Sequence, residues 1–226
     1  MKLRVINLDR RSDRWIQIRS QLRELPAENV LRISAIDAKS GISLDSRLVS
    51  RGNVACWLSH QICFQEQIQN SEEWTVVLED DADFHVDIST QMLDSLIQKC
   101  QSLSIDVLQL GWIEIFYRPL SPRWLLDMVL ASRAGRRIGG KGGQGLSIVL
   151  GEFRAGSHAY LISKNGAEKL LGTNVPAVLG ADAFLSAMAQ NHYQDSGIKF
   201  ARLSKSLAGQ ASRDGKSSSI DTDIFN

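Results

Sequence analysis

Apolar residues recur along the first half of the chain in two alternating patterns, short runs and stripes with helical spacing. The short runs predict buried strands at 3–8, 30–36, 75–78 and 105–110. Stripes in which apolar residues return every three or four positions predict helices at 12–25, 54–69 and 93–103. Because the helices fall between the strands, the pattern predicts an α/β fold with a mostly parallel central sheet flanked by helices.

The pattern dissolves between residues 114 and 150 and then returns. This stretch holds two prolines, and residues 135–145 contain six glycines, which predicts a flexible insertion and a mobile loop. A strand is expected at 157–162, followed by helices at 163–172 and 181–190 and by a polar tail from 211. No repeat or composition shift divides the chain, so we expect one domain over residues 1–226.

Residues that commonly cap or stop helices indicate where two of the predicted helices begin and end. Ser12 is predicted to cap the first helix and Pro26 to end it. Ser163 is predicted to cap the helix that follows the strand at 157–162, and Gly172 to close it.

Composition and charge exclude several classes of protein. With 43% hydrophobic and 23% charged residues among 226, the chain can bury a core and is not disordered as a whole. Lysine and arginine exceed aspartate and glutamate by only one, 26 against 25. That balance gives no electrostatic footprint for a nucleic acid or an anionic membrane, and we expect no nucleic-acid partner.

Cysteine usage and hydropathy bear on the compartment. The three cysteines (Cys56, Cys63 and Cys100) have no CxxC spacing, so neither a disulfide framework nor a zinc knuckle is expected. The first residues lack the apolar region of a signal peptide, and no window of eighteen residues is apolar throughout. We therefore expect a cytoplasmic protein with no transmembrane segment, at most peripheral at a membrane.

Acidic residues crowd the exit of the strand at 75–78, where Glu79, Asp80, Asp81 and Asp83 follow Leu78. Carboxylates so close together repel one another unless a cation lies among them. Mg²⁺ and Mn²⁺ are held in proteins by one or two carboxylates together with substrate phosphates. The cluster therefore predicts a metal–phosphate site, with a solvated acidic turn as the alternative.

Five short motifs recur in a fixed order along the chain. They are INLDRRSDR at 6–14, AIDA at 35–38, CWLSH at 56–60, VLEDDA at 77–82 and GSHAYLIS at 156–163. Together they cover most of residues 3–172, and Asp182 and Gln210 fit two further blocks. In this order the motifs resemble those of glycosyltransferase family 25, which includes lipopolysaccharide sugar transferases and collagen galactosyltransferases.

The resemblance implies a GT-A-like fold and a metal-dependent glycosyltransferase. It implies transfer of a hexose from a nucleotide-sugar donor, expected to be a UDP-hexose, to a hydroxyl of a glycan or lipid-linked saccharide acceptor. The expected cofactor is Mn²⁺ (or Mg²⁺), and the transfer would invert the anomeric centre. The expected context is assembly of a cell-surface polysaccharide or lipopolysaccharide.

Carried onto this sequence, the resemblance assigns roles to eleven residues. The expected donor contacts are Asn7, Leu8, Asp9, Arg14, Ser59, His60, Glu79, Asp80 and His158, and the expected metal ligands are Glu79, Asp80 and Asp81. Asp182 is the expected catalytic base, because an inverting transfer needs a carboxylate to deprotonate the acceptor hydroxyl.

Each of these residues also has a purely structural interpretation. Arg14 would then be an exposed helix arginine, and His60 and His158 would be satisfied within or beside the core. Asp182 would interact with the dipole at the start of its helix.

Two other functions would use the same acidic cluster. One is a metal-dependent phosphoryl or nucleotidyl transferase. The other is a catalytically silent module that binds a nucleotide or a glycan without turnover.

Overall fold

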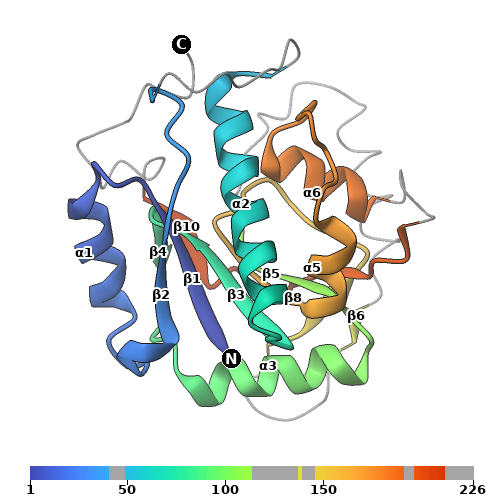
Figure 1. The fold of residues 1–226 in the computed structure, drawn as a ribbon. Helices are drawn as coiled ribbons and strands as arrows, with labels where there is room; N and C mark the ends of the chain where they lie inside the picture. Colours follow the sequence, from blue (N-terminus) through green and yellow to red (C-terminus); the bar gives the residue numbers. More distant parts are fainter. Residues whose placement is uncertain (41–48, 114–136, 139–145, 191–195, 212–226) are drawn as a thin grey trace, which may run out of the picture.

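A ten-stranded sheet with helices against both faces forms the structure, a computed structural model that describes residues 1–40, 49–113, 137–138, 146–190 and 196–211 (Figure 1). Eight strands lie side by side in the order β2-β1-β3-β8-β5-β9-β7-β6, and β10 joins β5 to β4. The strands are β1 (Lys2–Asn7), β2 (Val30–Ser34), β3 (Trp74–Glu79), β4 (Ala82–Phe84), β5 (Val107–Gly111), β6 (Arg137–Ile138), β7 (Ile148–Leu150), β8 (Ala159–Ser163), β9 (Phe200–Leu203) and β10 (Ala208–Gln210).

The described helices are α1 (Ser12–Gln21), α2 (Arg51–Gln69), α3 (Thr90–Ser102), α5 (Lys164–Leu170) and α6 (Ala181–Ala189), with a short 3₁₀ turn at Ala27–Asn29. No helix among the described residues is both long enough and apolar enough to cross a membrane.

Strand direction agrees with the expected mostly parallel sheet. β1 pairs in parallel with both β2 and β3, and β5 pairs in parallel with β9. β8 lies antiparallel between β3 and β5, so that β3 and β5 share one direction. The predicted α/β fold with helices on a central sheet is confirmed. Because β1, β2 and β3 are parallel, the motifs at their carboxyl ends meet at one edge of the sheet.

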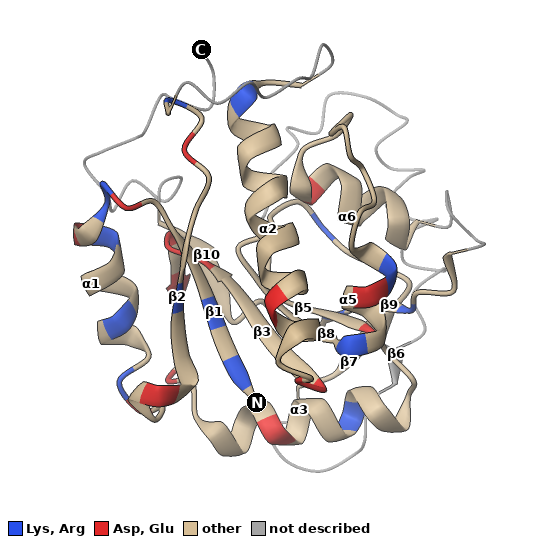
Figure 2. Ribbon diagram, in the orientation of Figure 1, with Lys and Arg blue, Asp and Glu red and all other residues tan. Residues whose placement is uncertain are grey.

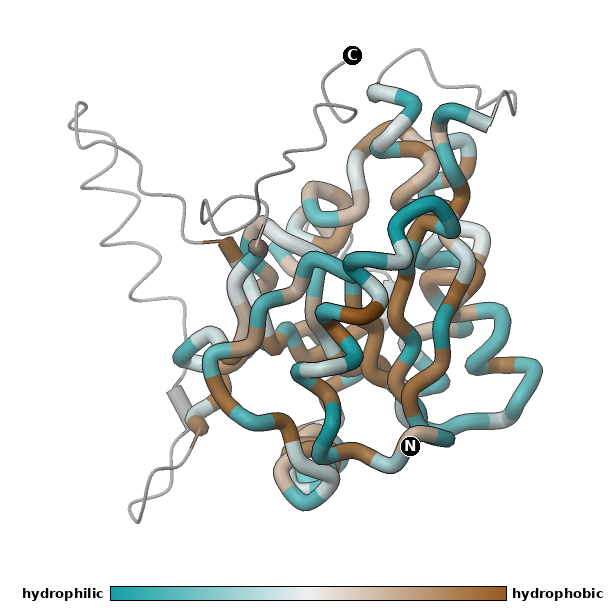
Figure 3. The backbone as a smooth tube through the Cα atoms, turned by 90° about the vertical axis from the view of Figure 1, so that its left-hand side faces the viewer, coloured by the Kyte–Doolittle hydropathy of each residue, from teal (hydrophilic) through white to brown (hydrophobic). Residues whose placement is uncertain are grey.

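Alternation along the strands divides the core into two layers. Leu3, Val5 and Leu78 pack with residues of α1 and α3, whereas Ile6 and Val77 pack with residues of α2, α5 and α6. Successive strand side chains point to opposite faces, so one strand supplies both layers. Figure 3 shows brown, hydrophobic stretches running through the middle of the molecule and teal, hydrophilic ones in many of the outer turns.

The caps of two helices show where the sequence interpretation held and where it was wrong. The Ser163 hydroxyl accepts a hydrogen bond from the Gly166 amide at 3.0 Å, as expected of a cap. Ser12, by contrast, is already the first residue of α1, and the capping position falls on Arg11, which makes no side-chain cap bond. The same helix ends at Gln21 rather than near Pro26.

Much of the predicted insertion lies outside the described residues, including the glycine-rich loop apart from Arg137 and Ile138. Within the stretch 114–150, Arg137–Ile138 and Ile148–Leu150 pair antiparallel as β6 and β7, and β7 pairs with β9. These strands, which the sequence analysis did not anticipate, join residues 148–150 to the sheet. The single-domain organisation stays a prediction.

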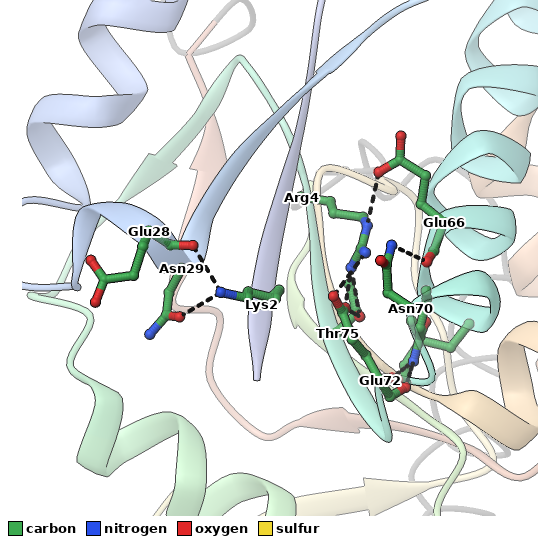
Figure 4. Close-up of polar contacts among 10 residues, drawn as sticks. Lys2, Arg4, Glu28, Asn29, Glu66, Asn70, Glu72 and Thr75 are labelled. Carbon is green, nitrogen blue, oxygen red and sulfur yellow. Dashed lines mark hydrogen bonds and ion pairs between the residues drawn. The ribbon is translucent and has the colours of Figure 1, made fainter.

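A buried arginine on β1, Arg4, ties that strand to the start of β3 and to α2. Arg4 on β1 is fully buried, and Nη1 and Nη2 of its guanidinium each donate to one carboxylate oxygen of Glu72 (Figure 4). It also donates to the Thr75 hydroxyl at 3.0 Å and reaches Glu66 on α2 at 3.4 Å. A buried charge must be paired and hydrogen-bonded in this way to be tolerated.

Removing the charge of Arg4 is expected to destabilise the fold strongly. Arg4→Met keeps an apolar stem of similar length but leaves the Glu72 carboxylate, whose side chain is 16% exposed, without its partner. Loss of one partner of a buried pair typically costs about 3 kcal/mol. Urea unfolding should show that loss for Arg4→Met but less than about 0.5 kcal/mol for Arg23→Met, whose side chain is 72% exposed. Equal stability of the two variants would contradict this account of the network.

Candidate functional site

A cavity of about 530 Å³ opens where β1, β2 and β3 end, beside the start of α2. Its walls come from the turn after β1, the loop after β2, the first turns of α2, the end of β3 and Gln210. In open α/β sheets ligands bind beyond the carboxyl ends of the strands. The cavity therefore lies where the topology places a ligand, and four of the five sequence motifs contribute to it.

Asp80 is held by groups from the first motif. The side-chain amide of Asn7 donates to Asp80 Oδ2 at 2.7 Å, and Arg14 Nη1 donates to Asp80 Oδ1 at 3.2 Å. The same amide of Asn7 also donates to the Arg11 carbonyl at 2.9 Å, so it ties the turn after β1 to the acidic cluster. Burial raises the pKa of Asp80, and the contacts from Asn7 and Arg14 oppose that shift.

Glu79 turns toward α2 and the segment before β8. Its Oε1 accepts from the Ser157 hydroxyl at 2.6 Å and lies 3.5 Å from His60 Nε2. Burial acts to raise the pKa of Glu79, but the neighbouring imidazole of His60 and the hydrogen bond from Ser157 outweigh it and lower the pKa. Glu79 therefore remains ionised beside the cavity.

The pKa of Asp81 is shifted in the opposite direction to that of Glu79. Burial first, and then the neighbouring charges of Glu79 and Asp80, raise the pKa of Asp81 to about 7. Its Oδ2 accepts a hydrogen bond from the side-chain amide of Gln210 at 2.9 Å. The three carboxylates follow one another at the end of β3 and all line the cavity. This all-oxygen donor set fits Mg²⁺ or Mn²⁺, because those cations prefer carboxylate oxygens and would offset the repulsion.

Basic side chains line the same cavity as the acidic cluster. Arg10, Lys39 and Arg51 line it together with Arg14, and Arg10 Nε pairs with Asp37 Oδ2 at 2.8 Å. Figure 2 shows basic segments at the start of α1 and at the start of α2. Cations and carboxylates around one cavity suit a ligand with phosphate groups, which arginine and lysine bind through charge-assisted hydrogen bonds.

The structure gathers most of the sequence-predicted residues at this cavity. Those that line it are Leu8, Arg14, Ser59, Glu79, Asp80 and Asp81. Asn7 and His60 lie just behind the lining, where each contacts one of the three carboxylates. Ser59 joins two walls, because its hydroxyl accepts from the Ile36 amide at 2.9 Å and donates to the Ala55 carbonyl at 2.7 Å.

Two predicted donor contacts lie away from the lining. Asp9 is exposed, and its carboxylate pairs with Arg32 at 2.9 Å and with the Ser34 hydroxyl at 2.7 Å. His158 is fully buried, with Nε2 at 3.1 Å from the Ala208 carbonyl. Any part these two residues play in donor binding stays a prediction.

Asp182 lies in the first turn of α6 and does not line the cavity. Its Oδ1 accepts from the Ala183 amide at 2.8 Å and its Oδ2 from the Gly156 amide at 3.3 Å. Its negative charge is nevertheless near enough to Cys56, a lining residue, to raise the pKa of that thiol, although burial is the larger cause. α6 packs against α2, where the rings of Phe184 and Trp57 lie 4.9 Å apart, so Asp182 belongs to the helix next to one that lines the cavity.

Three basic lining residues were missed by the sequence analysis. Arg10 lies inside the first motif, Lys39 lies in the loop after β2, and Arg51 lies next to Ser50, which caps α2. At such positions the sequence does not show whether a lysine or arginine faces solvent or a ligand. Gln210 was matched to a family block without a role, and the structure gives it one as the partner of Asp81.

Comparison with known proteins gives similarity to galactosyltransferases. The human (Homo sapiens) procollagen galactosyltransferase 2 is 27% identical over 206 residues, which cover 83% of this chain and 30% of that protein. The mouse (Mus musculus) procollagen galactosyltransferase 2 is 25% identical over 209 residues, and the zebrafish (Danio rerio) procollagen galactosyltransferase 1 is 27% identical over 206, with 83% of this chain covered in each case. The chain spans about 30% of the length of these relatives.

The match to a solved structure, the crystal structure of A197 from STIV, covers 92% of this chain and 83% of that chain, with a TM-score of 0.42 and 11% sequence identity. The family described as "Glycosyltransferase family 25 (LPS biosynthesis protein)" matches residues 1–185, which include the whole acidic cluster and the turn that holds it. A glycosyltransferase was the enzyme class expected from the motifs. The chain belongs to glycosyltransferase family 25.

Proposed function

We propose that this chain is a metal-dependent hexosyltransferase whose nucleotide-sugar donor binds in the cavity at the ends of β1, β2 and β3. The observation that carries the proposal is the pairing of three carboxylates with four basic residues around one cavity of about 530 Å³. A nucleoside diphosphate needs both kinds of group, cations for its phosphates and a metal site between phosphate and protein.

The basic residues bind and orient the diphosphate in this account. Arg10, Lys39 and Arg51 supply donors from three different elements, so the phosphates are contacted from more than one direction. Arg14 and Asn7 hold the Asp80 carboxylate in place, which fixes one side of the acidic cluster before a ligand arrives. Pre-positioned groups of this kind lower the reorganisation needed for transfer.

The expected cofactor is Mn²⁺ (or Mg²⁺), and Glu79, Asp80 and Asp81 would hold it. Such a cation, when bound, supplies charge that stabilises the diphosphate leaving group. Asp182 is the proposed base, which would take the proton from the acceptor hydroxyl in an inverting transfer. The packing of α6 against α2, a helix that lines the cavity, supports this role.

The names of the relatives support a choice of hexose and acceptor to test. The names of the similar proteins specify galactose transfer to procollagen, and the family description refers to lipopolysaccharide synthesis. We propose a UDP-hexose, with UDP-galactose as the first donor to test, and a hydroxyl of a cell-surface glycan or lipid-linked saccharide as the acceptor. A cytoplasmic location, with or without peripheral association at a membrane, is part of the same proposal.

A thermal-shift screen tests donor binding. Nucleotide sugars should raise the melting temperature only when Mn²⁺ is also present, because a ligand stabilises the folded state by RT ln(1 + [L]/Kd), about 2.7 kcal/mol at a hundred times Kd. UDP-galactose and UDP-glucose are compared with GDP-mannose, and Ca²⁺ replaces Mn²⁺ as a control for charge alone. The absence of a shift with every nucleotide sugar in the presence of Mn²⁺ would contradict the proposal.

A further inference from the structure

Three side chains of different chemistry meet on the inner wall of the cavity. Cys56 and His60 are four residues apart on α2 and therefore share one helix face. Glu79, the last residue of β3, faces them. One ligand atom from each of the three residues lies within 4.8 Å of the other two.

The imidazole of His60 is oriented by a contact on its far side. Nδ1 lies 2.8 Å from the Tyr160 hydroxyl, and the whole side chain is buried. Nε2 faces Glu79 Oε1 at 3.5 Å, longer than a normal hydrogen bond, and has no hydrogen-bond partner among the described residues. In metal sites the ring nitrogen that does not bind the metal is commonly held by a hydrogen bond, as Nδ1 of His60 is by Tyr160.

Glu79 is supported in the same way. The Ser157 hydroxyl donates to its Oε1 at 2.6 Å, so the carboxylate is positioned from the segment before β8. Outer contacts of this kind commonly hold ligating carboxylates and histidines in metal sites. Cys56 and Glu79 both line the cavity, which gives a cation a route from solvent to the buried histidine.

We propose that Cys56, His60 and Glu79 form a binding site for Zn²⁺, which shares Glu79 with the all-oxygen set that the proposed function assigns to Mn²⁺ but has its other two ligands on α2. A sulfur, an imidazole nitrogen and a carboxylate oxygen are the ligand types that zinc takes, whereas Mg²⁺ and Mn²⁺ favour oxygen. Three protein ligands leave a fourth tetrahedral position, and the access from the cavity provides room for it. The inference rests on this geometry and holds whether or not the chain transfers a sugar.

Cobalt spectroscopy tests the site, because Co²⁺ takes the place of Zn²⁺ and reports sulfur ligation directly. Co²⁺ added to the intact chain should produce a sulfur-to-cobalt charge-transfer band in the near ultraviolet, which saturates at one equivalent and disappears when Zn²⁺ is added. Cys56→Ala should abolish the band, and His60→Gln should weaken Co²⁺ binding at least tenfold, the scale of losing a ligand. Cys56→Ser serves in place of Cys56→Ala where the alanine variant does not fold.

Two matched variants separate this site from other sources of signal. Cys100→Ala removes a buried thiol on α3 that is remote from the cavity lining, and it should keep the band. Asp81→Asn alters the carboxylate set without touching the three proposed ligands, and it should also keep the band even where UDP binding is lost. A wild-type chain with no charge-transfer band, or a band that survives Cys56→Ala, overturns the zinc site and leaves the proposed donor site untouched.

Discussion

Asp81→Asn is expected to weaken Mn²⁺-dependent UDP binding by about 10²-fold while the protein stays folded. Asp81 lines the cavity beside Glu79 and Asp80, so its charge belongs to the set that would hold the cation. A loss of about 2.8 kcal/mol corresponds to that factor at 1.4 kcal/mol for each tenfold change, within the several kcal/mol that a bound metal supplies. Isothermal titration with UDP, with and without Mn²⁺, measures the effect.

The stability of the same variant provides a second readout. Burial and two neighbouring carboxylates disfavour the charged form of Asp81, so removing the charge relieves repulsion when no metal is bound. An asparagine still offers an oxygen to the Gln210 amide, and the melting temperature without Mn²⁺ should therefore not fall. Asp83→Asn on β4 is the matched control, because Asp83 does not line the cavity. Unchanged UDP affinity for Asp81→Asn in Mn²⁺ would remove Asp81 from the metal set.

Asp182→Asn is expected to lower turnover by about 10²-fold or more with little change in donor binding. That factor is the usual scale for the loss of a general base. Asparagine keeps one oxygen to accept from the Ala183 amide, the shorter bond at 2.8 Å, and loses only the acceptor of the longer bond from the Gly156 amide at 3.3 Å, so the start of α6 should keep its geometry. Steady-state rates with a fixed acceptor, together with the dissociation constant for UDP, separate catalysis from binding.

The alternative role of Asp182 predicts a different pattern. A carboxylate that only favours the helix dipole contributes about 0.3–1 kcal/mol of stability and nothing specific to turnover. Asp94→Asn on α3 controls for the loss of a helical acid outside the site. Near-normal turnover of Asp182→Asn, or loss of UDP binding in its place, would show that Asp182 is not the base.

The architecture was predictable where hydrophobic periodicity is long and regular. α2 and α3 follow stripes that span several turns, and β1 and β3, which are buried on both faces, contain the short apolar runs Val5–Ile6 and Val76–Leu78. β4, β7 and β10 have only three residues each, too few to show a period, and β9 carries Arg202, whose buried guanidinium pairs with Glu152 at 2.7 Å. Tertiary pairing, not local pattern, makes these four segments strands.

The site was predictable only where its residues lie in one motif. The carboxylates at the end of β3 are consecutive in sequence, so their crowding is visible without a structure. The contact of His60 with Tyr160, a hundred residues away in sequence, is created by the packing of α2 on β8. The basic wall of Arg10, Lys39 and Arg51 is likewise assembled from three elements by the parallel pairing of β1 and β2 and the placing of α2.

Product analysis tests the central claim most directly. The chain is incubated with a UDP-hexose, Mn²⁺ and a mixture of saccharide acceptors, and the nucleotide products are separated by chromatography. The account predicts release of UDP together with a hexose-extended acceptor, and loss of both in Asp81→Asn. UMP with a sugar phosphate would show phosphoryl or nucleotidyl transfer, and metal-dependent donor binding with no product would show a silent binding module. Either of these results would contradict the proposed glycosyl transfer.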